Sequence, residues 1–77
     1  MVTYVSMRVL DATMNDLGRL EVHPQVHVLM IRVRGLTQPV KLRMEELPTT
    51  ERVLVAPPLP QGWVMLLGEK IRRRTRA

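Results

Sequence analysis

The stretch "VHVLMIRVRGLTQPVKLRM", residues 26–44, contains the clearest strand pattern in the chain. From residue 40 to residue 45, apolar and charged side chains alternate strictly. A period of two is typical of a strand that buries one face. In residues 26–31 nearly every side chain is apolar, which predicts a strand covered on both faces, by barrel closure or by another subunit. We therefore predict two strands joined by a turn at residues 35–39.

Alternation of the same kind occurs outside this stretch. Residues 3–10, 19–22 and 52–56 are further strand candidates. Residues 11–18, rich in Asp, Asn and Gly, predict a turn or loop. Residues 57–62, "PPLPQG", predict a rigid extended connection, because proline fixes φ and lacks an N–H. The sequence predicts an all-β fold, a small five- to six-stranded antiparallel barrel or two-layer sheet.

The last apolar segment, residues 63–67, is compatible with two structures. We favour a strand, because Gly68 inside a helix would cost about 1 kcal/mol relative to alanine. A short C-terminal helix within residues 63–72, and hence an α+β fold, stays open as the alternative.

The chain is short and contains no cysteine. Its 77 residues, 45% of them hydrophobic, suffice for one small domain with a core. Without cysteine, neither disulfides nor thiolate-bound zinc can supplement that core. The absence of cysteine also agrees with an intracellular setting, and we expect a cytoplasmic protein. The first residues, "MVTYVSMRVL", lack the pattern of a signal peptide. No apolar run approaches the roughly 20 residues of a membrane span, so we expect no membrane partner.

Positive charge is concentrated near the C-terminus. Residues 69–77, "EKIRRRTRA", contain five basic residues and one acidic residue, 5 − 1 = +4 of the net charge of +5. Residues 1–68 contain seven basic and six acidic residues and are nearly neutral. We therefore predict a single β-rich domain, residues 1–68, followed by a basic tail, residues 69–77. Such a tail either contacts an anionic partner or acts as a solubilising extension.

The predicted hairpin gathers four cations on one face. Pairing Val33 with Val40 sets Arg32 opposite Lys41, and a shift by two residues sets Arg34 opposite Lys41 instead. Like charges oppose each other in both registers, which is mildly destabilising. This face either binds an anion or is simply solvated, and it carries none of the aromatic residues on which bases stack. With the tail, the candidate nucleic-acid-binding residues are Arg32, Arg34, Lys41, Arg43, Lys70, Arg72, Arg73, Arg74 and Arg76.

The apolar half of the first hairpin strand supplies a candidate protein interface. Val26, Val28 and Met30 alternate with His27, Leu29 and Ile31, so the strand has two largely apolar faces. Only one of them can face the core of so small a domain. We therefore predict that Val26, Val28 and Met30 contact a partner protein or a second copy of the chain.

The two histidines do not predict a metal site. His23 and His27 are four residues apart, about 13 Å along an extended strand, which is too far for one ion. Pro24 between them opposes a helix that would bring them together. We expect His27 to be a hydrogen-bonded core or interface residue.

No enzyme motif is present in the chain. Asp11 and Asp16 could be viewed as an acid/base pair, but aspartate is also common in turns, where it bonds the nearby backbone. The sequence has no glycine-rich phosphate loop, no HExxH and no nucleophile elbow. We expect no catalytic residue, no cofactor and no small-molecule substrate.

The segment "VLVAPPLPQGWVMLLG", residues 53–68, loosely resembles the late part of retropepsin-like aspartic proteases, where an apolar strand leads to Leu-Gly. The resemblance extends over about residues 40–71 and implies a barrel-like β fold. The Asp-Thr/Ser-Gly triplet of that family is missing from this chain, so no catalytic residue is carried over.

Together these patterns predict a non-enzymatic, oligomeric binding or assembly module whose basic tail contacts an anionic partner, with nucleic acid as the leading class. One alternative is a structural subunit of a larger viral or ribonucleoprotein assembly. Another is the remnant of a retropepsin-like barrel without catalytic residues.

Overall fold

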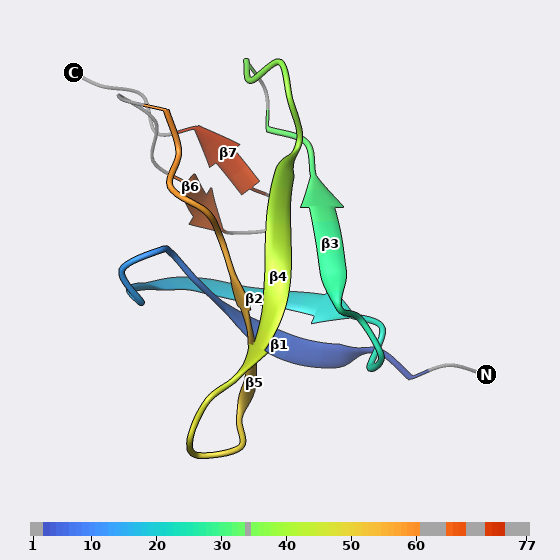
Figure 1. Ribbon diagram of the computed structural model, residues 1–77. Helices are drawn as coiled ribbons and strands as arrows, with labels where there is room; N and C mark the ends of the chain where they lie inside the picture. The colour runs from blue at the N-terminus through green and yellow to red at the C-terminus, as the bar shows by residue number, and fades with distance from the viewer. Residues whose placement is uncertain (1–2, 34, 61–64, 68–70, 74–77) are drawn as a thin grey trace.

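The computed structural model of the chain describes residues 3–33, 35–60, 65–67 and 71–73 (Figure 1). These residues form strands and turns and contain no helix. The strands are β1 (Val5–Leu10), β2 (Asp16–Val22), β3 (Val28–Ile31), β4 (Val40–Glu46), β5 (Arg52–Val55), β6 (Met65–Leu67) and β7 (Ile71–Arg73).

Five of these strands form one sheet in the order β2-β1-β5-β4-β3, which curls into a half-barrel (Figure 1). The predicted all-β fold is confirmed. The expected purely antiparallel pairing is wrong, because β5 lies parallel to β1. The parallel contact continues past β5, where the N–H of Ala56 donates to the carbonyl of Leu10 at 2.8 Å. As a result, β5 joins a β1–β2 hairpin to a β3–β4 hairpin.

The central position of β5 agrees with its composition. Both Val53 and Leu54 are fully buried although they point to opposite faces of the sheet. A strand apolar on both faces is typical of a position in the middle of a sheet. The run "RVLVA" therefore forms the strand to which both hairpins are bound.

The core fills the concave inner face of the half-barrel. It is built on Val9, Leu42 and Leu54, each with no exposed surface. Other buried residues of the core come from β1, β2 and β4 and from the segments that directly follow β3 and β5, while β3 itself contributes none. In β4 the predicted alternation is confirmed, since Val40 and Leu42 are buried and their odd-numbered neighbours are exposed. Burial of apolar area of this kind is the main source of stability.

The turn between β1 and β2 confirms the predicted role of Asp11. One carboxylate oxygen of Asp11 accepts the backbone N–H groups of Thr13 and Asn15, each at 2.9 Å. These hydrogen bonds lower the pKa of Asp11, since they favour the ionised form. Met14 takes a positive φ of 71°, which tightens the turn. The second strand begins at Asp16, three residues before the predicted strand at 19–22.

The last strands form a separate two-stranded sheet. β6 pairs with β7 in antiparallel fashion, and β6 lies beside β2. The predicted strand at residues 63–67 is found in β6, while residues 63 and 64 lie outside the described ranges. Residues 71–73 of the predicted basic tail form β7.

Candidate functional site

The candidate site lies on the β3–β4 hairpin, whose register differs from both predicted registers. Ile31 lies opposite Val40 and Leu29 opposite Leu42, two residues away from the expected pairing of Val33 with Val40. β3 is also shorter than the predicted strand, with four residues instead of nine. A shift by two residues keeps every side chain on its face, so the assignment of faces still holds.

The corrected register removes the expected opposition of like charges. Met30 lies opposite Lys41, and Val28 lies opposite Arg43. We call the side of the sheet that carries these four residues the outer face. Each cation is thus paired with an apolar side chain, where its own methylene groups can cover apolar surface. Arg32 follows the end of β3 and is exposed, while Arg34 lies outside the described residues.

The three predicted interface residues do not lie together. Val28 and Met30 are 42% and 54% exposed on the outer face. Val26 is half-buried and packs against the core, so it does not belong to the exposed patch. Among the residues that the structure describes, β3 is therefore covered on its inner face alone, and Val28 and Met30 are exposed.

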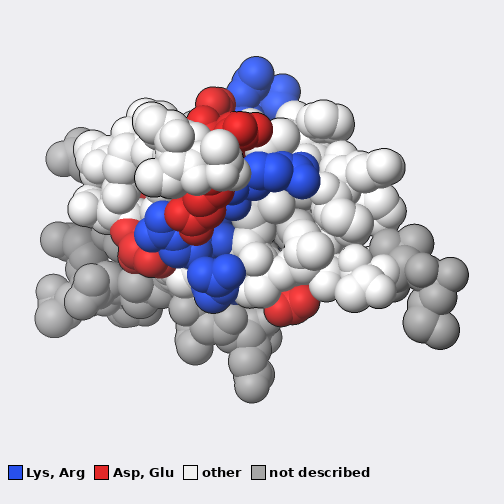
Figure 2. Space-filling model, turned by 90° about the horizontal axis from the view of Figure 1, so that it is seen from below, with Lys and Arg blue, Asp and Glu red and all other residues white. Residues whose placement is uncertain are grey.

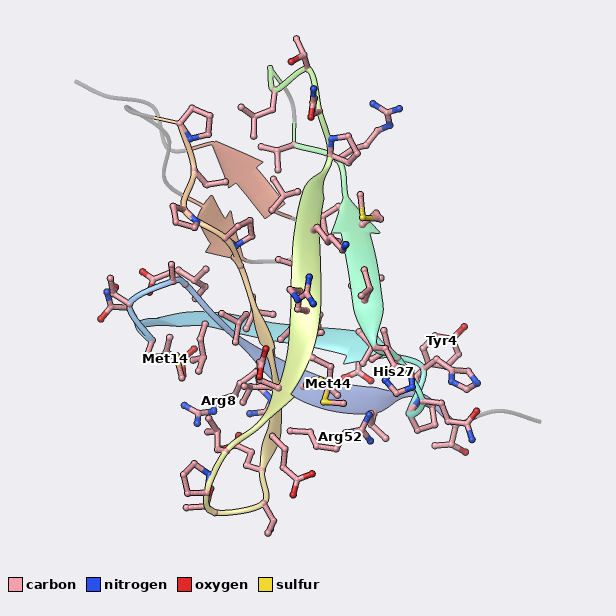
Figure 3. All side chains as sticks on the ribbon, in the orientation of Figure 1. Tyr4, Arg8, Met14, His27, Met44 and Arg52 are labelled. Carbon is pink, nitrogen blue, oxygen red and sulfur yellow. The ribbon has the colours of Figure 1, made fainter. Side chains whose placement is uncertain are left out.

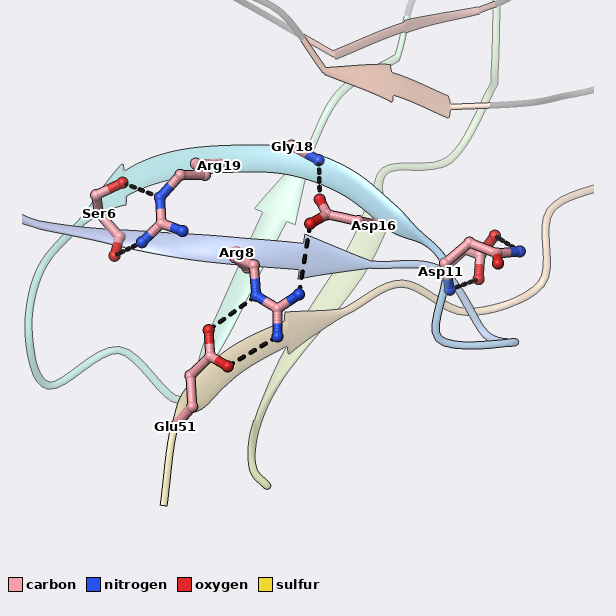
Figure 4. Close-up of polar contacts among 8 residues, drawn as sticks. Ser6, Arg8, Asp11, Asp16, Gly18, Arg19 and Glu51 are labelled. Carbon is pink, nitrogen blue, oxygen red and sulfur yellow. Dashed lines mark hydrogen bonds and ion pairs between the residues drawn. The ribbon is translucent and has the colours of Figure 1, made fainter. Parts of the chain in front are cut away.

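Arg8 is the most strongly paired cation in the described part of the chain. Its guanidinium donates two hydrogen bonds to the carboxylate of Glu51, at 2.8 and 2.7 Å, and reaches Asp16 at 3.4 Å (Figure 4). This bidentate contact raises the pKa of Arg8 and lowers the pKa of Glu51. Arg8 is thus neutralised by carboxylates and is not available to an anion. Nothing in the sequence pattern pointed to this pair, because Arg8 and Glu51 are 43 positions apart.

Two other cations hold the backbone of their neighbours. Arg52 donates to the carbonyls of Pro24 and Val26, at 2.8 and 3.4 Å, and fastens the loop between β2 and β3. Figure 3 shows Arg52 extending from β5 toward this loop. Arg19 donates to the hydroxyl of Ser6 at 2.7 Å and to its carbonyl at 3.0 Å. Both guanidinium groups are used inside the fold.

The described cations therefore divide into two groups. Those of β1, β2 and β5 have partners within the chain. Arg32, Lys41 and Arg43, by contrast, make no ion pair or side-chain hydrogen bond with any residue that the structure describes. All three are exposed and come from the β3–β4 hairpin. Glu45 lies on the same side of β4 as Arg43, two residues further along.

The end of the molecule at the β4–β5 turn carries mixed charge. Figure 2, seen from that end, shows basic and acidic side chains interleaved across the middle, with uncharged surface on either side. The ion pairs of Arg8 with Asp16 and Glu51 show why charge there is balanced.

The histidines lie at the surface. His27 was expected to be a core or an interface residue; it is exposed, so the core alternative is wrong and the interface alternative stays a prediction. Its backbone carbonyl accepts the N–H of Met44 at 2.9 Å. His23 accepts the N–H of Gln25 at 3.1 Å, and its ring meets the ring of Tyr4 edge-on at 6.5 Å. Among the described residues, no three His, Asp or Glu side chains are grouped to hold a metal ion.

Asp11 and Asp16 both have hydrogen-bond partners close to them in the fold. Asp11 is engaged in its own turn, as described above. Asp16 accepts the N–H of Gly18 at 2.8 Å and contacts Arg8. Both carboxylates have structural partners, as predicted for turn residues.

A groove of about 400 Å³ lies next to the β3–β4 hairpin. Its walls are the turn at residues 36–39 and the proline-rich segment 57–60, and its lining is mainly apolar. Lys41 is one of the residues that line it, so the groove adjoins one of the three cations that lack a partner among the described residues. The predicted rigid connection thus forms one wall of a surface depression.

The C-terminal cations are placed only in part. Arg72 and Arg73 belong to β7, where they lie opposite Leu66 and Met65. Lys70, Arg74 and Arg76 lie outside the described residues.

In the described part of the chain there is no helix of the length and apolarity that crossing a membrane requires. Comparison with protein-family models, with curated protein sequences and with solved structures finds no match to this chain.

Proposed function

We propose that this protein is a non-enzymatic binding module that contacts nucleic acid through the outer face of its β3–β4 hairpin. The observation that carries the proposal is the division of its cations. Three of those described are satisfied inside the fold, whereas Arg32, Lys41 and Arg43 are exposed without a partner among the described residues. The basic residues of segment 69–77 provide a second contact with the same partner.

The spacing of these cations suits an extended polyanion. Lys41 and Arg43 project from the same side of β4, about 6.8 Å apart along the strand. β3 and β4 carry no aromatic side chain on the outer face. We therefore expect contacts with phosphates and not with stacked bases. Binding of this kind is insensitive to sequence and weakens steeply with salt, because it depends on counterion release.

Neutralising the face tests the proposal directly. In the variant Lys41→Gln/Arg43→Gln, two phosphate contacts with single-stranded DNA are lost. The slope of log affinity against log salt should then fall by about 1.4. Fluorescence anisotropy with a labelled single-stranded oligonucleotide, measured over a series of salt concentrations, gives this slope.

Arg19→Gln is the matched control, because Arg19 also lies on an exposed sheet surface but is bound to Ser6. It removes one charge and should leave the slope nearly unchanged. An equal loss per charge in the control, or an unchanged slope in the double variant, would contradict the proposal.

The contribution of segment 69–77 is tested separately. Replacing Arg72, Arg73, Arg74 and Arg76 by glutamine removes charge without deleting the backbone that pairs with β6. Combined with Lys41→Gln/Arg43→Gln, these substitutions should remove most of the salt dependence of binding that the double variant retains. Unchanged affinity would remove this segment from the mechanism and leave the β3–β4 face as the sole contact.

A structural subunit of a larger assembly is the second candidate function. It is favoured by the exposure of Val28 and Met30 on a strand at the edge of the sheet. Size-exclusion chromatography with light scattering separates the candidates. A salt-resistant assembly larger than a dimer and free of nucleic acid would favour the subunit, and protein that copurifies with nucleic acid at low salt would favour the binding module.

A further inference from the structure

The backbone of β3 has hydrogen-bonding groups that point away from the sheet. The N–H of Met44 donates to the carbonyl of His27, so His27 and Met44 form a hydrogen-bonded pair. In an antiparallel ladder such pairs alternate, and Leu29 and Ile31 therefore also bond to β4. The N–H and C=O groups of Val28 and Met30 consequently point outward.

No strand of the described sheet lies on that side of β3, which is the last strand in the order. Val28 and Met30 therefore combine exposed apolar side chains with backbone groups that have no partner among the described residues. Such an edge is a template for another strand.

The two edges of the sheet differ in their protection. At the β2 edge the ladder has an irregularity between Val9 and Leu10, and the strand contains Gly18 and the charged residues Arg19 and Glu21. Irregularities and charges of this kind discourage edge pairing. β2 is also flanked by β6. β3, with the sequence "VLMI", contains neither proline, charge nor bulge.

We propose that β3 pairs in antiparallel fashion with β3 of a second copy of this chain, to give a dimer with a continuous sheet. In the register we infer, Val28 lies opposite Met30 of the second copy, and Leu29 lies opposite Leu29 of the second copy. This register matches the outward backbone groups of both strands. It also keeps outer-face residues on the outer face, which a register shifted by one residue would not.

Two identical strands can pair here because the seam between them brings no like charges together. Val28 and Met30 of the two copies cover one another in the middle of the outer face. Lys41 and Arg43 stand one strand further in. The β4 strands of the two copies are then three strand spacings apart, about 14 Å. That separation exceeds the Debye length of about 8 Å at physiological salt, so repulsion between the two pairs of cations is screened.

The contact is short, which sets the strength of the dimer. Four residues on each side bury less surface than a typical stable interface. Association should therefore depend on concentration, with monomers at low and dimers at high micromolar concentration. The interface does not depend on binding of nucleic acid, so its test is independent of the function proposed above.

Two measurements on the full chain test this dimer. Sedimentation velocity over a wide range of protein concentration measures association, for the wild type and for Met30→Lys, which places a charge at the seam. Met14→Lys is the matched control, since Met14 is 51% exposed but lies in the β1–β2 turn, far from β3 (Figure 3). Amide hydrogen exchange by NMR reports on Val28 and Met30 individually.

We expect the wild type and Met14→Lys to dimerise, and Met30→Lys to remain a monomer. The exchange of the Val28 and Met30 amides should slow as concentration rises, while that of Leu29, already bonded to β4, should change far less. Slow exchange at Leu29 in Met30→Lys verifies that the variant is folded. A wild type that is monomeric throughout, or a dimer in which Val28 and Met30 still exchange quickly, would overturn the proposal.

Discussion

At the scale of single residues, the environment of each arginine decides its role. Arg8 meets a carboxylate in two-point contact and acts as a link between β1 and the residue that precedes β5. Arg52 satisfies backbone carbonyls of a loop. Lys41 and Arg43 meet apolar side chains across the strand instead. Composition alone gives these residues the same charge, and only their neighbours separate the cations that are bound within the fold from those without a partner among the described residues.

Carboxylate pairing makes stability depend on acid pH. The pKa of Glu51 lies below its ordinary value of 4.5, and the pKa of Asp11 lies below 3.8. Groups with a depressed pKa stabilise the fold above their ordinary pKa, and this stabilisation is lost as pH falls through the folded-state pKa. We predict that the urea midpoint falls as pH drops below about 4.5.

The variant Glu51→Gln isolates one of these groups. Its urea midpoint at neutral pH should be below that of the wild type, and its decline in acid should be shallower, because the glutamine amide does not titrate. Since the Glu51 side chain is 39% exposed, solvent moderates the effect. A pH profile parallel to that of the wild type would show that the Arg8–Glu51 pair does not contribute.

At the scale of secondary-structure elements, a period of two predicts where a strand such as β4 lies and which face it buries, but it does not predict which strand pairs with it. The faces of β4 were predictable because apolar and charged residues alternate from residue 40 to residue 45. The register with β3 was not, since registers that differ by two residues keep the same faces and β3 has only four residues to distinguish them. The Arg8–Glu51 contact was also beyond prediction, because it joins residues that are far apart in the sequence.

Truncating a side chain should destabilise the fold far more on the inner face of the β3–β4 hairpin than on the outer face. Leu42 is fully buried on the inner face, so Leu42→Ala should cost about 2–5 kcal/mol of unfolding free energy. Met30 is 54% exposed, so Met30→Ala should cost less than about 0.5 kcal/mol. Urea denaturation of both variants, at a concentration where the chain is monomeric, provides the comparison. Similar losses would mean that the assignment of faces is wrong.

At the scale of the whole molecule, the sheet consists of two local hairpins and one strand that joins them. Each hairpin, β1–β2 and β3–β4, pairs two strands that are neighbours in the sequence. Within the described sheet, β5 lies between the two hairpins and links them. A domain of this length has about 4–12 kcal/mol of stability in total. Loss of one central strand is therefore enough to unfold it.

A chain ended after Thr50 tests this dependence on β5. It retains both hairpins but lacks Val53 and Leu54, the two fully buried residues between them. We predict no cooperative thermal transition by circular dichroism and little dispersion of amide signals in NMR. A cooperative transition near that of the full chain would show that the two hairpins are joined by other contacts.

The parallel pairing of β1 with β5 also has a consequence for synthesis on the ribosome. Val9 and Leu54, which are paired in the sheet, are 54 − 9 = 45 positions apart. At about 5–20 residues per second, translation needs about 2–9 s to cover that distance. During this interval the emerging β1–β2 hairpin has no neighbour for its apolar face. The nascent chain is therefore most in need of a chaperone in the few seconds before β5 appears, and any pause placed before Arg52 would lengthen that exposure.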